Sequence, residues 1–313
     1  MAVIPGQKRK QPEDETQRQY ENNLFEIHTT HGSQYLQEGK YEKAEAALAK
    51  AVELKPENAE AHTKLGYVRL PQKKWAEAEA ALAKAVQLKP EDAEAHSGLG
   101  FALKEQEKWA EAEAALAKAV QLKPEDARLH KSLGLVRITQ EKWAEAEQAL
   151  AKAVELKPED ADTLFWLGLT RLHQKKWAEA EAALAKAVQL KSEDADTHYF
   201  LGFARLKQKK WVEAEAALAK AVQLKPEYAE AHKFLGYARL KQEKWVEAEA
   251  ALAKAVQLQP EDADTLFSLG DALAEQKKRK QAEEAYAMAV KKTSPEETAE
   301  RLYAGRVHAN EDA

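Results

Sequence analysis

The chain has 313 residues, with 48 Lys and Arg against 53 Asp and Glu, a formal net charge of −5 and no cysteine. The absence of cysteine excludes disulfides, zinc–thiolate sites, iron–sulfur clusters and a cysteine nucleophile. The negative charge disfavours a surface devoted to nucleic acid or anionic lipid, and the sequence contains no apolar run of the ~18 residues that a membrane span needs.

Residues 1–24 form a polar N-terminal segment. We expect Met1 to about Glu15 to be disordered, because this stretch is polar and contains proline, and the rest to enter the first helix. It lacks the apolar stretch of a secretory signal, which predicts a cytoplasmic location. The basic run of Lys8, Arg9 and Lys10 is compatible with a nuclear signal, although we favour a solvated tail.

From residue 25 onward the chain repeats every 34 residues. A Leu-Gly pair recurs at this spacing, with the glycines at Gly66, Gly100, Gly134, Gly168, Gly202, Gly236 and Gly270. The period divides the chain into eight units, the first of them weaker, at 25–58, 59–92, 93–126, 127–160, 161–194, 195–228, 229–262 and 263–296. Such units bury their apolar faces by stacking on their neighbours.

Each unit is expected to hold two helices joined by a short turn, at about 59–71 and 75–88 in the second unit. Asn58, Asp92 and the equivalent aspartates precede the first helix as N-caps, and Tyr228 breaks this pattern. A proline two residues earlier ends the preceding helix. In the second helix, Ala78, Leu82 and Ala85 are spaced to form one buried face behind a recurrent tryptophan.

The recurrence of Leu-Gly, an aromatic residue, alanines and Pro at period 34 resembles the tetratricopeptide repeat (TPR) family. The resemblance implies an all-α fold, a right-handed α-solenoid superhelix of about eight helix-turn-helix repeats, with the first helices lining a concave groove. The last repeat replaces the recurrent Trp with Arg279 and is followed by Pro295, so we expect a C-terminal capping helix within 297–313, near Glu296 to Val307.

Two positions of the first helix depart from the family pattern. The fourth position is mostly histidine, which we interpret as structural, because successive histidines lie a whole unit apart and cannot share a metal ion. The eleventh is mostly arginine. In the first account, the arginines lay their stems over the interface and either extend the guanidinium outward or pair with a Glu of a neighbouring second helix. In the second, they face the groove while leucines such as Leu70 and Leu172 enter the core. The series comprises Arg69, Arg137, Arg171, Arg205 and Arg239.

The first helices also vary at the positions that the resemblance assigns to the groove, and an aromatic cluster results. We predict a peptide-binding groove with a basic rim, although some rings could simply pack between neighbouring helices. Its residues are Phe165, Trp166, Tyr199, Phe200, Phe203, Phe234, Tyr237, Lys207, Lys241 and His173.

The sequence therefore indicates a non-enzymatic scaffold for a protein or peptide partner, with no cofactor or metal and with neither nucleic acid nor a membrane as partner. No asparagine occupies the groove positions, which disfavours a carboxylate-clamp receptor of the Hsp70/Hsp90 type. A self-assembling structural oligomer is the alternative, and a regulatory subunit of an enzyme complex is a further one. Recent duplication and consensus engineering both explain the near-identical second helices.

Overall fold

The computed structural model describes residues 12–294, and within them every regular element is an α-helix. The chain forms two compact units, unit 1 (Met1–Lys157) and unit 2 (Pro158–Ala313). In unit 1 the helices are α1 (Pro12–Gln37), α2 (Tyr41–Leu54), α3 (Ala59–Arg69), α4 (Trp75–Leu88), α5 (Ala93–Lys104), α6 (Trp109–Leu122), α7 (Ala127–Thr139) and α8 (Trp143–Leu156). In unit 2 they are α9 (Ala161–His173), α10 (Trp177–Leu190), α11 (Ala195–Lys207), α12 (Trp211–Leu224), α13 (Ala229–Leu240), α14 (Trp245–Leu258), α15 (Ala263–Glu275) and α16 (Arg279–Val290).

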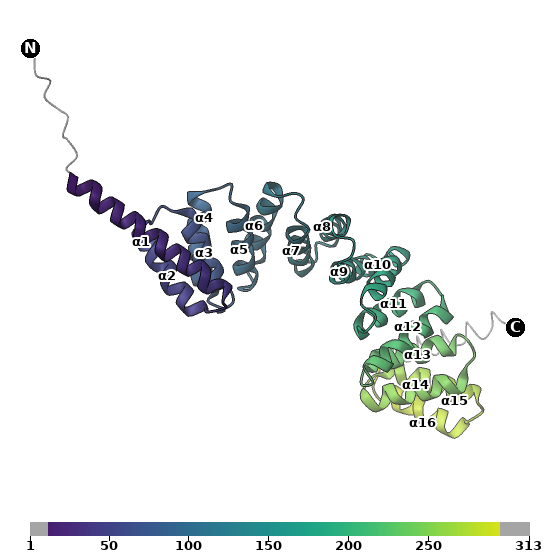
Figure 1. The fold of residues 1–313 in the computed structure, drawn as a ribbon. Helices are drawn as coiled ribbons and strands as arrows, with labels where there is room; N and C mark the ends of the chain where they lie inside the picture. Colours follow the sequence, from purple (N-terminus) through teal and green to yellow (C-terminus); the bar gives the residue numbers. More distant parts are fainter. Residues whose placement is uncertain (1–11, 295–313) are drawn as a thin grey trace, which may run out of the picture. The chain divides into compact units, whose positions relative to one another are not determined.

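Within each unit, consecutive helices pack as hairpins, and the second helix of one hairpin contacts the first helix of the next (Figure 1). The prediction of an all-α repeat solenoid is confirmed. The division into eight 34-residue repeats stays a prediction, and helix α1 begins at Pro12, well before the first expected repeat at residue 25. The expected capping helix and the basic run Lys8–Lys10 lie outside the described residues.

The N-caps are confirmed. The Asp92 carboxylate accepts hydrogen bonds from the backbone N–H groups of Glu94 and Ala95. The other side chains that accept from backbone N–H groups at a helix start are those of Asn58, Asp126, Asp160, Asp194 and Asp262. Tyr228 provides no side-chain cap to α13. Each cap satisfies N–H groups that a helix start leaves without a partner, so it fixes where the first helix begins.

The turn inside each hairpin has one backbone form throughout. In the first hairpin the residue with a positive φ is Gly39 (φ +70°), two residues after α1 ends, and in the next it is Lys73 (φ 58°), four residues after α3 ends. The N–H of Lys74 donates to the Arg69 carbonyl and that of Lys73 to the Leu70 carbonyl, which is the Schellman motif of helix ends. Lys73 therefore stands at the turn position that glycine occupies in the first hairpin, and its backbone has a left-handed conformation that L-residues rarely adopt.

The core lies between the helices of each hairpin and its neighbours. Ala78, Leu82 and Ala85 of α4 are buried, as the spacing predicts. A methyl group on Gly66 would lie 2.4 Å from the Leu82 Cγ atom, so glycine allows α3 and α4 to pack this closely. The recurrent tryptophans at the start of the second helices are only half-buried.

Candidate functional site

Five of the fourth-position histidines have a structural role. The Nε2 atoms of His62, His96, His130, His198 and His232 lie 2.8 or 2.9 Å from the backbone carbonyl oxygen of the residue six positions earlier. Because a carbonyl oxygen only accepts hydrogen bonds, Nε2 carries the proton and donates it. The histidines therefore tie the start of the first helix to the preceding turn, which confirms the structural interpretation.

The arginines lie at the interface between hairpins, as the first of the two accounts predicts. The Nε atom of Arg205 in α11 donates to Glu181 in α10 at 2.9 Å, and its Nη1 atom donates to the Glu213 carbonyl in α12 at 3.1 Å. Arg69, Arg137 and Arg239 make the same carboxylate pair. Arg171 donates to the Glu179 carbonyl. The groove-facing account is wrong for these arginines, although Leu70 and Leu172 do enter the core.

Glu181 is the centre of a three-donor cluster. Besides Arg205, it accepts hydrogen bonds from Gln208 at 2.9 Å and Lys210 at 2.6 Å, and only 16% of its side chain is exposed. Burial raises the pKa of its carboxyl, but the hydrogen bonds from Lys210, Arg205 and Gln208 outweigh burial and lower the pKa below its ordinary value of 4.5. Glu45, Glu113 and Glu215 repeat this cluster.

Six of the seven predicted aromatic residues of unit 2 are connected ring to ring over α9, α11 and α13, and the seventh, Tyr237, packs on Trp211. The connected rings meet mainly edge to face, with centroids 5.9 Å apart for Phe165 and Phe200 and 5.3 Å apart for Phe203 and Phe234. Tyr199 joins the two pairs, because its ring contacts both Phe200 and Phe234. Burial, together with the nearby Glu230, raises the pKa of Tyr199 to about 12. We call this set, with Trp166 and Tyr237, the aromatic surface.

The rings of the aromatic surface pack between neighbouring first helices and are also accessible from outside. Phe165, Tyr199, Phe200, Phe203 and Phe234 are all half-buried. Their inner faces contact the apolar clusters around Leu184 and Leu218. The aromatic surface therefore stabilises unit 2 and also leaves part of its apolar area exposed to solvent.

A cavity of about 400 Å³ opens on this surface and gathers half of the predicted site. We call it the unit 2 pocket. Apolar side chains, among them Leu169, Leu172 and Trp177, make up much of its wall. The predicted residues that line it are Tyr199, Phe200, Phe203, Lys207 and His173, and Lys175 adds a further cation. The Lys207 ammonium lies 5.1 Å from the centre of the Phe203 ring.

Other predicted residues lie outside this pocket. Phe165 and Trp166 line a separate polar hollow that also contains Asp162, Asp194 and Asp196. Tyr237 is 38% exposed and packs edge to face on Trp211, with the Lys241 ammonium 5.5 Å from its ring centre. Trp211, Tyr237 and Lys241 thus repeat the arrangement of Trp177, Phe203 and Lys207 one hairpin further along the chain.

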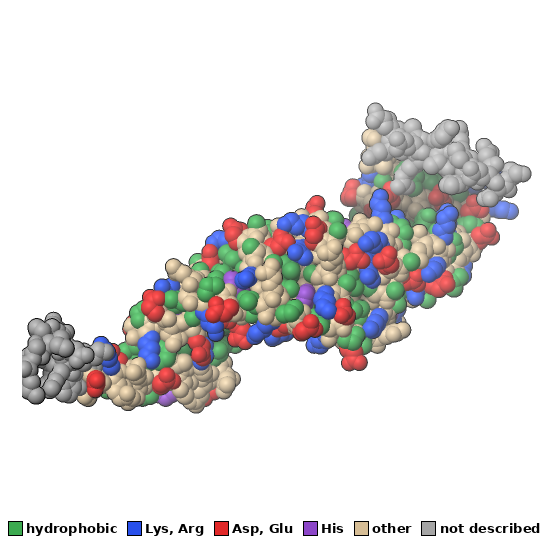
Figure 2. All heavy atoms as spheres, turned by 90° about the horizontal axis from the view of Figure 1, so that it is seen from above, with side chains coloured by type: hydrophobic (Ala, Val, Ile, Leu, Met, Phe, Trp, Pro, Cys, Tyr) green, Lys and Arg blue, Asp and Glu red, His purple; other side chains and the backbone are tan. Residues whose placement is uncertain are grey.

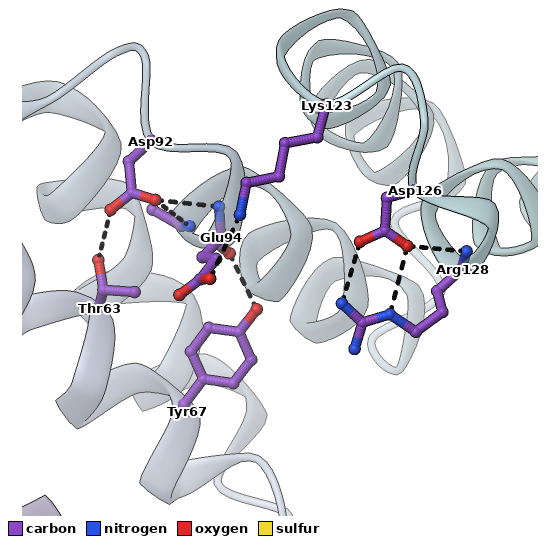
Figure 3. A network of polar contacts seen from close by, with 8 residues as sticks. Thr63, Tyr67, Asp92, Glu94, Lys123, Asp126 and Arg128 are labelled. Atoms are coloured by element: carbon purple, nitrogen blue, oxygen red, sulfur yellow. Dashed lines mark hydrogen bonds and ion pairs between the residues drawn. The ribbon is translucent and has the colours of Figure 1, made fainter.

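Unit 1 contains a larger cavity, of about 610 Å³, that the sequence did not predict and that we call the unit 1 pocket. Tyr67, Trp75 and Phe101 contribute its aromatic walls, and Ser97 and Ser132 lie where later hairpins carry aromatic residues. Two ion pairs border it, Lys123 with Glu94 and Arg128 with Asp126 (Figure 3). The available signal was the loss of aromatic residues from the first-helix positions of this part of the chain.

The described surface carries mixed charge. Figure 2 shows Lys and Arg side chains interspersed with Asp and Glu over the described part of the visible face. Over residues 12–294, no three His, Asp or Glu side chains are grouped so that they could hold a metal ion. None of the helices described is both long enough and apolar enough to span a bilayer.

Three family models match the chain. The C-terminal domain of cilia and flagella-associated protein 70 matches residues 29–164, and subunit 3 of the anaphase-promoting complex, or cyclosome, matches residues 139–221. A tetratricopeptide repeat model matches residues 199–263 and 235–298. No curated protein matches the chain significantly.

Several solved structures are similar to the chain. YrrB, described as a TPR protein with an unusual peptide-binding site, is 25% identical, covers 59% of this chain and 96% of its own, and superposes with a TM-score of 0.56. MamA is 25% identical, with 53% and 91% covered and a TM-score of 0.51. The C-terminal part of a TPR protein from Cytophaga hutchinsonii shares the fold alone, at 16% identity, with 80% and 99% covered and a TM-score of 0.60. The 34-residue period, the helical hairpins and these matches together place the chain in the tetratricopeptide repeat family.

Proposed function

We propose that the chain is a non-enzymatic scaffold that binds a peptide segment of a partner protein on the aromatic surface of unit 2. The observation that carries the proposal is the composition of the unit 2 pocket. Its wall combines aliphatic and aromatic side chains with three basic residues, His173, Lys175 and Lys207, and includes no carboxylate. Such a site favours a segment that presents a bulky apolar side chain next to acidic residues.

Each part of the pocket acts on a different part of that segment. The apolar walls remove an inserted leucine or phenylalanine side chain from water, which is the main source of affinity. Lys207 extends over the Phe203 ring and is exposed, so its ammonium can meet a carboxylate that lies beside the inserted side chain. Charge at the rim mainly speeds association and selects partners. YrrB, which has a similar fold, is described as having a peptide-binding site.

The experiment uses a fluorescein-labelled synthetic peptide in which one phenylalanine is flanked by glutamates. Lys207→Glu reverses the charge at the rim, whereas Lys186→Glu makes the same change on the exposed face of α10 in the same unit. We expect Lys207→Glu to weaken binding by roughly tenfold, equivalent to about 1.4 kcal/mol, and Lys186→Glu to leave it within twofold. Fluorescence anisotropy at low salt measures both dissociation constants.

Equal weakening by the two substitutions would show only a general charge effect and would reject the site. Lys207 is a sharper choice than an aromatic residue, because Phe200 and Phe234 also hold neighbouring helices together. Removing their rings would lower stability and binding at once. Affinity capture by the full chain, compared between wild type and Lys207→Glu, then extends the test to natural partners.

A further inference from the structure

The unit 1 pocket and the unit 2 pocket lie at equivalent positions of two different hairpins. Positions of one map onto positions of the other after three periods of 34 residues, so that Trp75 corresponds to Trp177, and Phe101 to Phe203. Tyr67 stands where unit 2 has Leu169, and Gly98 stands where it has Phe200. Three further positions carry an aromatic residue in unit 2 and none in unit 1. Unit 2 carries aromatic residues at Tyr199, Tyr228 and Phe234, and unit 1 carries Ser97, Asp126 and Ser132 in their place.

In unit 2 the three rings fill the space beside Phe203. Tyr199 contacts Tyr228 at 4.8 Å and Phe234 at 6.0 Å between ring centres. The Phe234 ring meets Phe203 edge to face at 5.3 Å. The chain therefore shows which kind of group fits this space, because an aromatic ring from the next first helix already occupies it in unit 2.

In unit 1 the same space is open. Ser97, Ser132 and Asp126 all line the cavity, which at about 610 Å³ is larger than the 400 Å³ of the unit 2 pocket. Phe101 remains on its wall, is 41% exposed and packs against Trp75 at 6.0 Å. Tyr67 is held in place because its hydroxyl donates to the Glu94 carbonyl at 3.0 Å (Figure 3).

Two of the three cations around the opening are paired with carboxylates. The Lys123 ammonium lies 3.3 Å from the Glu94 carboxylate. The Arg128 guanidinium folds back onto Asp126, with Nη2 donating at 3.0 Å and Nε at 3.2 Å (Figure 3). Lys73 is the remaining charged residue of the lining. An occupant of this pocket is consequently selected by shape and by its ring more than by its charge, in contrast to the occupant proposed for unit 2.

We propose that the unit 1 pocket binds a phenylalanine or tyrosine side chain from an uncharged segment of a partner polypeptide. The inserted ring takes the position that Phe234 holds in unit 2 and packs edge to face on Phe101. This is a second binding site, with its own residues and its own ligand chemistry, and it does not depend on the aromatic surface of unit 2.

The test fills the unit 1 pocket with the aromatic side chain that unit 2 carries at the equivalent position. Ser132→Phe places in unit 1 the residue that unit 2 carries at the corresponding position, and Ser132→Ala removes the hydroxyl but leaves the cavity open. The probe is an acetylated and amidated peptide with one phenylalanine among glycines and serines, followed by ligand-observed NMR on the full chain. We expect wild type and Ser132→Ala to bind within twofold of each other, and Ser132→Phe to bind at least tenfold more weakly.

Further measurements keep the result specific. Phe101→Ala should also weaken binding, whereas Lys207→Glu in unit 2 should leave it unchanged. Raising the salt concentration from 50 to 500 mM should change the dissociation constant less than twofold, because two of the three cations at the opening are paired with carboxylates. Circular dichroism melting of Ser132→Phe reports whether unit 1 stays folded, and Phe101→Ala serves as the readout if it does not.

Three outcomes would overturn the proposal. The first is no binding of the probe by wild type, and the second is equal binding when the probe's phenylalanine is replaced by alanine. The third is a wild-type dimer in sedimentation velocity that Ser132→Phe converts to a monomer, which would assign the pocket to a second copy of the chain. Loss of acidic-peptide binding at unit 2 would not affect any of these results.

Discussion

Replacing Glu181 by glutamine removes one negative charge from the junction between α10 and the hairpin of α11 and α12. The carboxylate accepts hydrogen bonds from Arg205, Gln208 and Lys210 at 2.6 to 2.9 Å. Glutamine has nearly the same shape but only one acceptor oxygen, and its amide group meets two cations. The substitution therefore weakens the contact between hairpins without opening a cavity in the core.

The structure gives an estimate of the loss. A well-shielded hydrogen bond to a charged group contributes about 1.5–3 kcal/mol to the free energy of unfolding, and a solvent-exposed ion pair contributes about 1 kcal/mol or less. The side chains of Glu181 and Arg205 are 16% and 22% exposed, whereas that of Lys210 is 43% exposed. We therefore expect a total loss of about 2 kcal/mol, most of it from the Arg205 contact.

Urea denaturation followed by circular dichroism measures this loss as a lower midpoint. Because stability in a repeat array is a sum of hairpin and junction contributions, a weaker junction should also broaden the transition and lower its apparent m-value. Glu193→Gln is the matched control, since Glu193 is 71% exposed and pairs with Lys220 at 3.5 Å. A loss for Glu181→Gln that equals the control would refute the assigned role of the cluster.

Three further predictions concern the same scaffold. The folded-state pKa of Glu181 and its equivalents is lowered, so the stabilisation they provide is complete above about pH 4.5 and is lost as the pH falls through the folded pKa. The free energy of unfolding, measured from pH 7 to pH 3, should therefore decrease below about pH 4.5, and it should decrease less in Glu181→Gln. Gly168→Ala should destabilise by about 1–3 kcal/mol, because the new Cβ would lie 2.5 Å from the Leu184 Cγ atom; an unchanged urea midpoint would contradict the close packing of α9 and α10. Glu243→Gly should stabilise unit 2 by roughly 0.5–1 kcal/mol, because Glu243 has φ 60° at the helix end; a lower melting temperature would count against strain at this turn.

The helical hairpins could be predicted from the sequence because the signals that define them are local. A cap such as Asp92 binds N–H groups two and three residues away, and proline acts on its own neighbours. The burial of Leu82 and Ala85 follows from helical periodicity alone. These relationships need no knowledge of how hairpins pack on each other.

The arginine environment could not be settled in this way. Arg205 and Leu206 are adjacent in α11, and a small rotation of the helix exchanges which of them faces the preceding hairpin. In the structure both are accommodated, since Leu206 is buried while Arg205 reaches Glu181, a residue 24 positions earlier. That pairing depends on the angle between hairpins, which the 34-residue pattern does not specify.

The unit 1 pocket was missed for a different reason. Aromatic residues that are present predict a site, whereas this cavity lies where rings are absent, at Ser97, Asp126 and Ser132. Each of these residues is unremarkable on its own. Only the comparison with Tyr199, Tyr228 and Phe234, and the contacts between their rings, shows that the three positions border one space.

The fixed spacing of the glutamate cluster has a consequence for how such a chain can change in evolution. The donors lie 24, 27 and 29 residues after the glutamate, both at Glu113 in unit 1 and at Glu215 in unit 2. A gene segment that encodes one period therefore carries one set of donors, which meets the glutamate of the preceding period, and one glutamate, which meets the donors of the following period. Unequal recombination can lengthen or shorten the protein by whole hairpins, and each new boundary inherits a complete set of contacts.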